Sequence, residues 1–125
     1  MQTKCSTHQK DEQGYRQCLT CKRIAVEARV VKKVIDTLLL AGYELATDAD
    51  ADDGELTYSV DRKGLYERMR TVDDERLYAR KQGSPTSFVY FVYGNEGWDV
   101  VNDHGISLSC YLDPILDWAD KKFSR

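Results

Sequence analysis

The sequence lacks any long apolar run. No uninterrupted apolar stretch of the 125-residue chain approaches the ~18 residues of a membrane-spanning helix. The first residues, Met1 to Cys5, also lack the apolar core of a secretory signal. Hydrophobic residues make up 42% of the chain and charged residues 31%, a composition that is globular and not disordered. We therefore expect one domain of ordinary size in a cytosolic setting.

The chain also lacks a strong excess of charge of either sign. Its 18 basic and 21 acidic side chains give a formal net charge of −3. This balance argues against a protein whose whole surface binds nucleic acid, since such proteins are usually basic. A local basic face remains compatible with it.

Cysteine is scarce and unevenly placed. Three of the four cysteines lie within the first 21 residues, beside a histidine, and the fourth, Cys110, is far away. In an intracellular chain, such clustering more often indicates a metal site than disulfides. Structural zinc takes four thiolate and imidazole ligands in a tetrahedron. The predicted structural Zn²⁺ ligands are Cys5, His8, Cys18 and Cys21.

The spacing of these ligands suits two short turns. Two residues separate the members of each pair, and a loop that contains Gly14 separates the pairs. Four protein ligands leave no open position for water, so we expect the metal to be structural. The first 25 residues resemble a treble-clef or zinc-ribbon knuckle, which suggests a knuckle over 1–23 and an α+β domain over 24–125 within one folded unit. The alternative is a flexible tail with incidental thiols.

A long helix is predicted over 24–41, where glycine and proline are absent. Apolar residues recur there every three or four positions, and Gly42 supplies a stop. The polar side of this helix is expected to be a solvated basic face. The alternative is a phosphate-binding face for nucleic acid, made by Lys22, Arg23, Arg29, Lys32 and Lys33.

The rest of the chain predicts an antiparallel sheet of about five strands and two further helices. The expected strands are 43–47, 56–60, 77–81, 87–93 and 98–103, and the expected helices are 64–71 and a last one from Ser107 or Ser109 through Phe123. Both faces of the 87–93 strand are apolar, which predicts a central strand. The predicted fold class is therefore α+β.

An acidic segment lies between the first two predicted strands. Its alternating aspartates over 48–55 are typical of a calcium loop, but Gly54 stands at the seventh position instead of the sixth. Ser59 stands where the bidentate glutamate belongs. An acidic hairpin turn is the better interpretation, and whether this loop binds a cation is left open.

One segment suggests a family. The stretch from Val92 to Asp103, followed by a polar link and a helix, and the step Ala41-Gly42-Tyr43 after the first helix resemble small phage-encoded proteins of unknown function. Such proteins also tend to open with a Cys/His cluster. The resemblance implies a phage or prophage origin, expression in the cytoplasm of a bacterial host, and binding to host machinery or defence proteins.

Two binding functions follow from these observations. We expect a non-catalytic zinc-binding protein that binds and modulates a host protein, in host takeover or anti-defence, with a homodimer also allowed. The alternative is a nucleic-acid-binding protein that uses the knuckle and the basic face of the first helix. Four rings could then stack on bases, although core and sheet packing explains them more simply: Tyr78, Phe88, Tyr90 and Trp98.

An enzyme is the third hypothesis. His104, flanked by Asp103 and near Cys110, is the only candidate constellation. Proximity in sequence does not establish hydrogen-bond geometry, and Cys110 is most simply a buried small residue. We therefore expect no catalytic activity.

Overall fold

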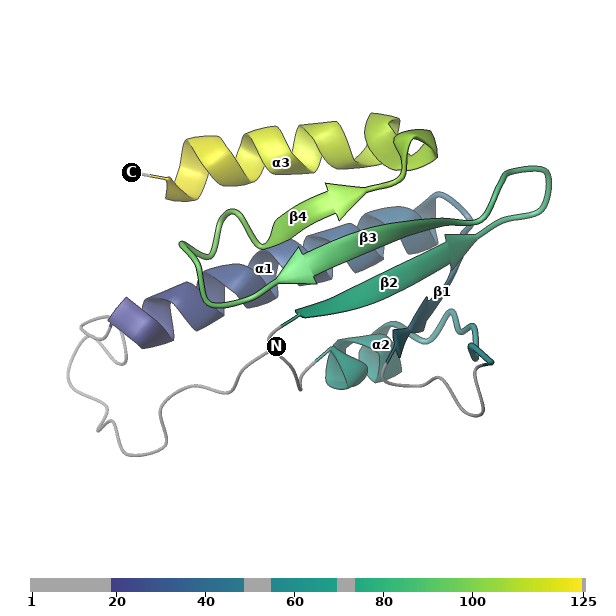
Figure 1. Ribbon diagram of the computed structural model, residues 1–125, viewed down its shortest axis with the longest axis horizontal. Coiled ribbons are helices and arrows are strands. Elements are labelled where there is room, and N and C mark those ends of the chain that lie inside the picture. Colours follow the sequence, from purple (N-terminus) through teal and green to yellow (C-terminus); the bar gives the residue numbers. More distant parts are fainter. Residues whose placement is uncertain (1–18, 49–54, 70–73, 125) are drawn as a thin grey trace.

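The protein has an α+β fold. The computed structural model describes residues 19–48, 55–69 and 74–124 (Figure 1). The elements in chain order are α1 (Leu19–Leu40), β1 (Glu44–Thr47), α2 (Arg62–Arg68), β2 (Asp74–Arg80), β3 (Ser87–Val92), β4 (Val101–His104), a 3₁₀ turn η3 (Ile106–Leu108) and α3 (Ser109–Phe123). The predicted fold class is confirmed.

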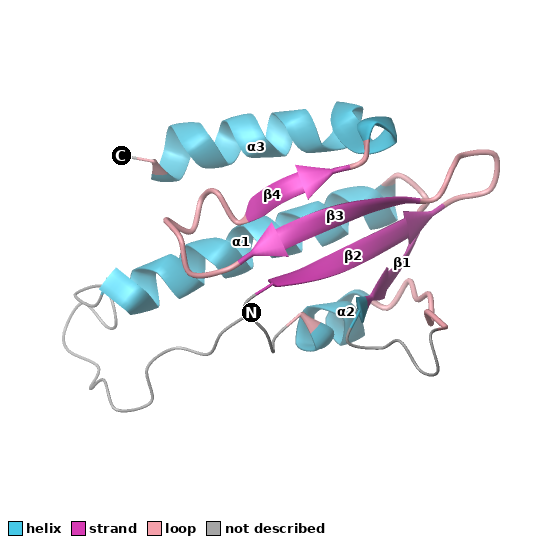
Figure 2. Cartoon of the chain, viewed as in Figure 1, coloured by secondary structure: helices cyan, strands magenta, loops and turns pink. Residues whose placement is uncertain are grey.

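The four strands form an antiparallel meander in the order β1-β2-β3-β4 (Figure 2). The strand β3 is central, as its sequence predicts, and pairs with β2 on one side and β4 on the other. The register with β4 shifts between Tyr90 and Phe91. Helix α1 packs along one face of this sheet, and α2 and α3 both contact α1.

The two faces of the sheet differ in burial. Successive side chains of a strand point to opposite faces. On the face toward α1, Leu77, Val89 and Phe91 are fully buried, whereas their neighbours Tyr78 and Phe88 are only half-buried. Helices therefore cover one face, and the other, which we call the open face, carries half-exposed rings.

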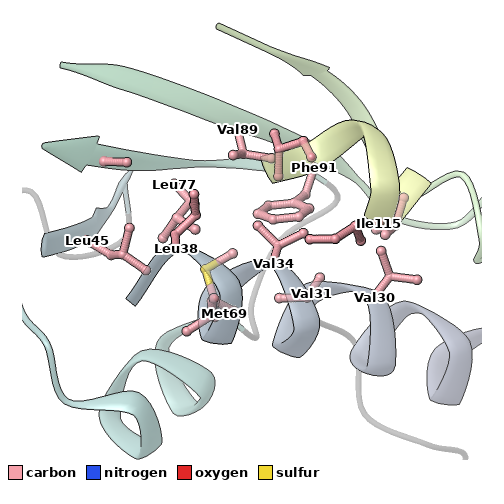
Figure 3. Close-up of a cluster of buried hydrophobic side chains, with 14 of the residues drawn as sticks. Val30, Val31, Val34, Leu38, Leu45, Met69, Leu77, Val89, Phe91 and Ile115 are labelled. Carbon is pink, nitrogen blue, oxygen red and sulfur yellow. The ribbon is translucent and has the colours of Figure 1, made fainter. Parts of the chain in front are cut away.

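Helix α1 supplies the largest share of the core (Figure 3). Its apolar stripe runs through five fully buried residues: Val30, Val31, Val34, Ile35 and Leu38. The helix stops as predicted, because Gly42 adopts a positive φ of 95°. The amides of Gly42 and Tyr43 then bind the carbonyls of Leu39 and Leu38, the pattern of a Schellman cap.

Two strand predictions were wrong in detail. The segment 56–60 forms no strand but only an isolated bridge between Ser59 and Leu45, and Val60 is 68% exposed, so little burial holds this segment to the sheet. The last strand begins at Val101 rather than at Trp98. The chain turns immediately before it, where the Val100 amide binds the Gly97 carbonyl. The sheet therefore has four strands instead of five.

Phe91→Ala should lower the free energy of unfolding by about 3–5 kcal/mol, because the ring is fully buried between the sheet and α1. Phe88→Ala is the matched control on the same strand and should cost only about 1 kcal/mol. Urea titration followed by circular dichroism measures both. An equal loss in the two variants would contradict the assignment of a covered and an open face.

Candidate anion-binding face on α1 and α3

Exposed cations gather on the solvent side of α1. The buried stripe faces the sheet, so Arg29, Lys32 and Lys33 fall on the opposite side of the helix and are exposed. Helix α3 packs against α1 and adds the exposed Lys122 near its end. Among the described residues, none of these four cations forms an ion pair.

Asp36, the acidic residue of α1 nearest to Lys32 and Lys33, interacts with residues of α2. Asp36 accepts a hydrogen bond from the Tyr66 hydroxyl and lies 3.0 Å from Arg62 Nε, both from α2. Burial and the adjacent Asp36 together raise the pKa of Tyr66 to about 12. Asp36 is therefore directed toward α2 rather than toward Lys32 or Lys33.

Two rings of α3 lie among these cations. Trp118 and Phe123 pack edge to face with their centroids 5.4 Å apart. The Arg29 guanidinium lies 5.1 Å from the Phe123 ring, and Lys33 Nζ lies 4.9 Å from the Trp118 ring. Lys122 Nζ lies about 6 Å from both rings. These are cation–π distances. We call these five residues the basic–aromatic face.

The residues predicted to bind nucleic acid are only partly brought together. Arg29 and Lys33 belong to the basic–aromatic face, Lys32 lies beside it over the Tyr66 ring, and Lys22 is exposed near the start of α1. Arg23 differs from the others. Its Nη1 contacts both carboxylate oxygens of Glu27, at 3.3 and 3.2 Å, and its side chain is only 17% exposed. Arg23 therefore supports the fold instead of the exposed face.

The rings that the nucleic-acid alternative named as base-stacking candidates do not lie near the cations of α1. Tyr78, Phe88 and Tyr90 lie on the open face of the sheet, on the side away from α1. Trp98 lies in the turn after β3 and packs against the core. Sequence reasoning missed the rings that do meet the cations. The signal was that Trp118 lies at the border of the apolar stripe of α3, three residues before Lys121 and four before Lys122.

The open face is poorly suited to phosphate. Arg80 lies 2.8 Å from Glu44 and 3.9 Å from the Tyr58 ring. Arg76 lies over Tyr90, whose hydroxyl binds Asp74. Among the residues that the structure describes on this side, the carboxylates outnumber these two arginines: Glu44, Asp48, Asp74 and Asp103. These carboxylates would repel a polyanion from the open face.

A buried carboxylate holds the turn after β3 against α1. Glu27 is 1% exposed, and its Oε2 accepts a hydrogen bond from the Gly94 amide at 2.8 Å in addition to the contacts with Arg23. A buried carboxylate is stable only with such partners. The start of α1 and the β3–β4 turn are therefore fixed relative to each other.

A second buried carboxylate lies on β2. Glu75 is 2% exposed and accepts a hydrogen bond from the Tyr93 hydroxyl. Burial raises the pKa of Glu75, although the bond from Tyr93 opposes the shift. Burial, followed by the charge of Glu75, raises the pKa of Tyr93. The pair therefore couples folding to protonation.

The suggested catalytic constellation is not assembled. His104 Nδ1 lies 2.9 Å from the Gly105 carbonyl oxygen, and its Nε2 lies 3.9 Å from the exposed Asp113. No hydrogen bond joins His104 to Cys110 in the described part of the chain. The expectation that Cys110 is buried was wrong, since it is exposed in the first turn of α3.

The predicted zinc site lies mostly outside the described residues. Cys5, His8 and Cys18 fall in 1–18, and the acidic loop 49–54 is likewise outside. Cys21 is the third residue of α1, and its side chain is 1% exposed. The role of Cys21 as a zinc ligand stays a prediction. Within 19–48, 55–69 and 74–124, no three His, Cys, Asp or Glu side chains form a metal-binding group.

Glu75→Gln should gain stability relative to the wild type as the pH rises. A raised folded-state pKa favours folding below the unfolded value of ~4.3, and this contribution is lost as the pH rises through the folded value. Glutamine cannot ionise, so it avoids that loss. Urea unfolding at about pH 4 and about pH 8 tests the sign, with the exposed Glu67→Gln as control. If the difference in unfolding free energy between Glu75→Gln and the wild type is the same at both pH values, this prediction is contradicted.

Comparisons with known proteins do not assign this chain to a family. No helix among the described residues is long and apolar enough to cross a membrane. The resemblance to phage-encoded proteins remains a prediction from the sequence. No family model, curated protein or solved structure matches the chain.

Proposed function

We propose that this protein binds nucleic acid without catalysing a reaction, through the basic–aromatic face of α1 and α3. The observation that carries the proposal is the group of exposed cations on that face, from two helices, for which the described residues supply no carboxylate partner. They occur in a chain whose net charge is −3. Like charges held together at a surface favour an anionic partner.

The rings make nucleic acid the better partner. A phosphate backbone supplies anions at regular spacing, and its bases supply flat faces that can stack on aromatic side chains. Trp118 and Phe123 are half-exposed and lie among the cations. The same face could instead contact an acidic surface of a host protein, because tryptophan and arginine often dominate protein interfaces. This competing partner agrees with the function expected from the phage resemblance.

We further propose that Cys5, His8, Cys18 and Cys21 hold a structural zinc ion. The support is the ligand spacing and the buried position of Cys21 at the start of α1. A metal there would tie the N-terminal segment to the end of α1 that carries Lys22. In this proposal the ion supports the fold and takes no part in chemistry.

Binding to nucleic acid should weaken steeply as the salt concentration rises, and it should depend on individual cations of the basic–aromatic face. Fluorescence anisotropy of labelled oligonucleotides between about 50 and 200 mM salt should give a linear fall of log K with log salt. Lys122→Gln should weaken binding across sequences and reduce the slope by about 1. The matched control is Lys121→Gln, because Lys121 is already paired with Asp117 at 2.9 Å.

The outcomes separate the two partners. If single- and double-stranded DNA and RNA all fail to bind at low salt, the nucleic-acid proposal is wrong and an acidic protein becomes the better partner for this face. Equal effects of Lys121→Gln and Lys122→Gln would show that the basic–aromatic face is not the site of contact.

Elemental analysis of the purified protein should find about one zinc per chain. Cys18→Ser and Cys21→Ser should each reduce that content to near zero, because a structural site requires all four ligands. Cys110→Ser is the control and should leave it unchanged, since Cys110 lies on α3. Zinc content that is unaffected by Cys21→Ser would contradict the assigned ligand set.

A further inference from the structure

A cleft opens where the basic–aromatic face meets the turn after β3. Its volume is about 420 Å³, within the range of ~300–1,000 Å³ typical of small-ligand sites. Residues of three segments line it: Lys22 and Val26 of α1, Gly94, Asn95 and Glu96 of the turn, and Phe123 of α3.

The cleft adjoins the basic–aromatic face. Phe123 belongs to both features, since its ring lies 5.1 Å from Arg29 and also forms part of the cleft wall. Lys22 is the exposed cation in the cleft, and no ion pair occupies it among the described residues. A strand bound along Lys33, Arg29 and Lys122 would therefore reach the cleft at Phe123.

The walls of the cleft are held in place. Arg23, which also lines it, is paired with Glu27, and Glu27 binds the Gly94 amide. The turn approaches α1 closely at Gly97, where an added Cβ would lie 3.1 Å from the Arg23 carbonyl oxygen. A preformed cleft lowers the cost of ordering on binding.

We propose that this cleft takes one unstacked nucleotide of a single strand whose backbone runs along the basic–aromatic face. The inference rests on the proposed function and makes it more specific. Phe123 and Val26 offer apolar walls for a base, and the Asn95 amide offers a donor and an acceptor for its edge. Lys22 would bind the adjoining phosphate.

The charges in the cleft determine how a bound nucleotide would be oriented. The carboxylate of Glu96 on the turn repels a phosphate, whereas Lys22 on α1 attracts it. The base therefore lies toward the turn and the phosphate toward α1. A duplex keeps its bases stacked inside the helix and cannot insert one without paying to unstack it. The cleft thus gives the protein a preference for single strands over duplex.

The test compares a thymidine 12-mer with a 12-base-pair duplex on the full-length protein. The wild type should bind the single strand about tenfold more tightly, as expected for stacking of one base. Asn95→Trp fills the cleft and should abolish this preference while leaving duplex affinity unchanged. The control Asn102→Trp places the same ring at an exposed position on β4 and should change neither.

A second measurement does not depend on the variant. A single strand with one 5-iodouracil should crosslink on irradiation to Phe123, identified by mass spectrometry. Crosslinks confined to Trp118, equal wild-type affinity for both oligonucleotides, or an Asn95→Trp protein that keeps its preference would each overturn the inference. In all three outcomes the basic–aromatic face would still bind nucleic acid, whereas failure of both oligonucleotides to bind would overturn the proposed function itself.

Discussion

The packing of α1 on one face of the sheet is the constraint on which the other features depend. Its stripe from Val30 to Leu38 is fully buried against Leu77, Val89 and Phe91. Each aliphatic side chain buried in this way contributes on the order of 1.5–3 kcal/mol. This packing fixes the rotation of α1 about its own axis. It therefore also decides which of its side chains face solvent.

The basic–aromatic face is a direct consequence of that rotation. With the valines turned inward, helical geometry leaves Arg29 and Lys33 on the outer surface. Helix α3 covers the neighbouring part of the core with Leu112, Ile115 and Ala119, all buried. The remaining side of α3 then brings Trp118 next to Lys33. Packing of apolar residues thus places the charges of α1 and brings Trp118 and Phe123, which pack against the edge of the core, next to them.

Glu27 is the exception to the solvated charges of α1. A buried carboxylate is costly, and removing one partner of such a pair usually costs more than the pair contributes. Here Arg23 and the Gly94 amide both contact it. The role of Glu27 is to position two segments, because its contacts join α1 to a turn 67 residues away in the sequence. That connection shapes the cleft beside Phe123.

The sequence predicted the elements whose pattern repeats over a long distance. Helices α1 and α3 show a clear helical period, α1 ends at the glycine at position 42, and the central strand β3 is a run that is apolar on both faces. The segment 56–60 also alternates, but a short alternating run says nothing about whether a core is available to bury it. In the structure Val60 is 68% exposed.

The candidate site was predictable only in part for a related reason. The helical period identified Arg29, Lys32 and Lys33 as a common face, since that is a property of one element. The rings that accompany them depend on how two elements pack. A strand with two apolar faces, like β3, does not reveal which face the helices cover, so the sequence could not tell whether Phe88 and Tyr90 lie near the cations of α1. The packing of α3 against α1, which no local sequence pattern contains, places Trp118 beside Lys33.

A local group of cations allows a chain with net charge −3 to attract the proposed anionic ligand. The carboxylates of the open face lie beyond the sheet from α1, and packed layers are spaced by about 10 Å. At physiological ionic strength the Debye length is about 8 Å, so charges separated by more than one layer interact weakly through solvent. A phosphate that approaches Lys33 therefore responds mainly to Arg29 and Lys122, and only slightly to Asp74 or Glu44. For the proposed anionic partner, the local charge set by the rotation of α1 therefore matters more than the net charge of the chain.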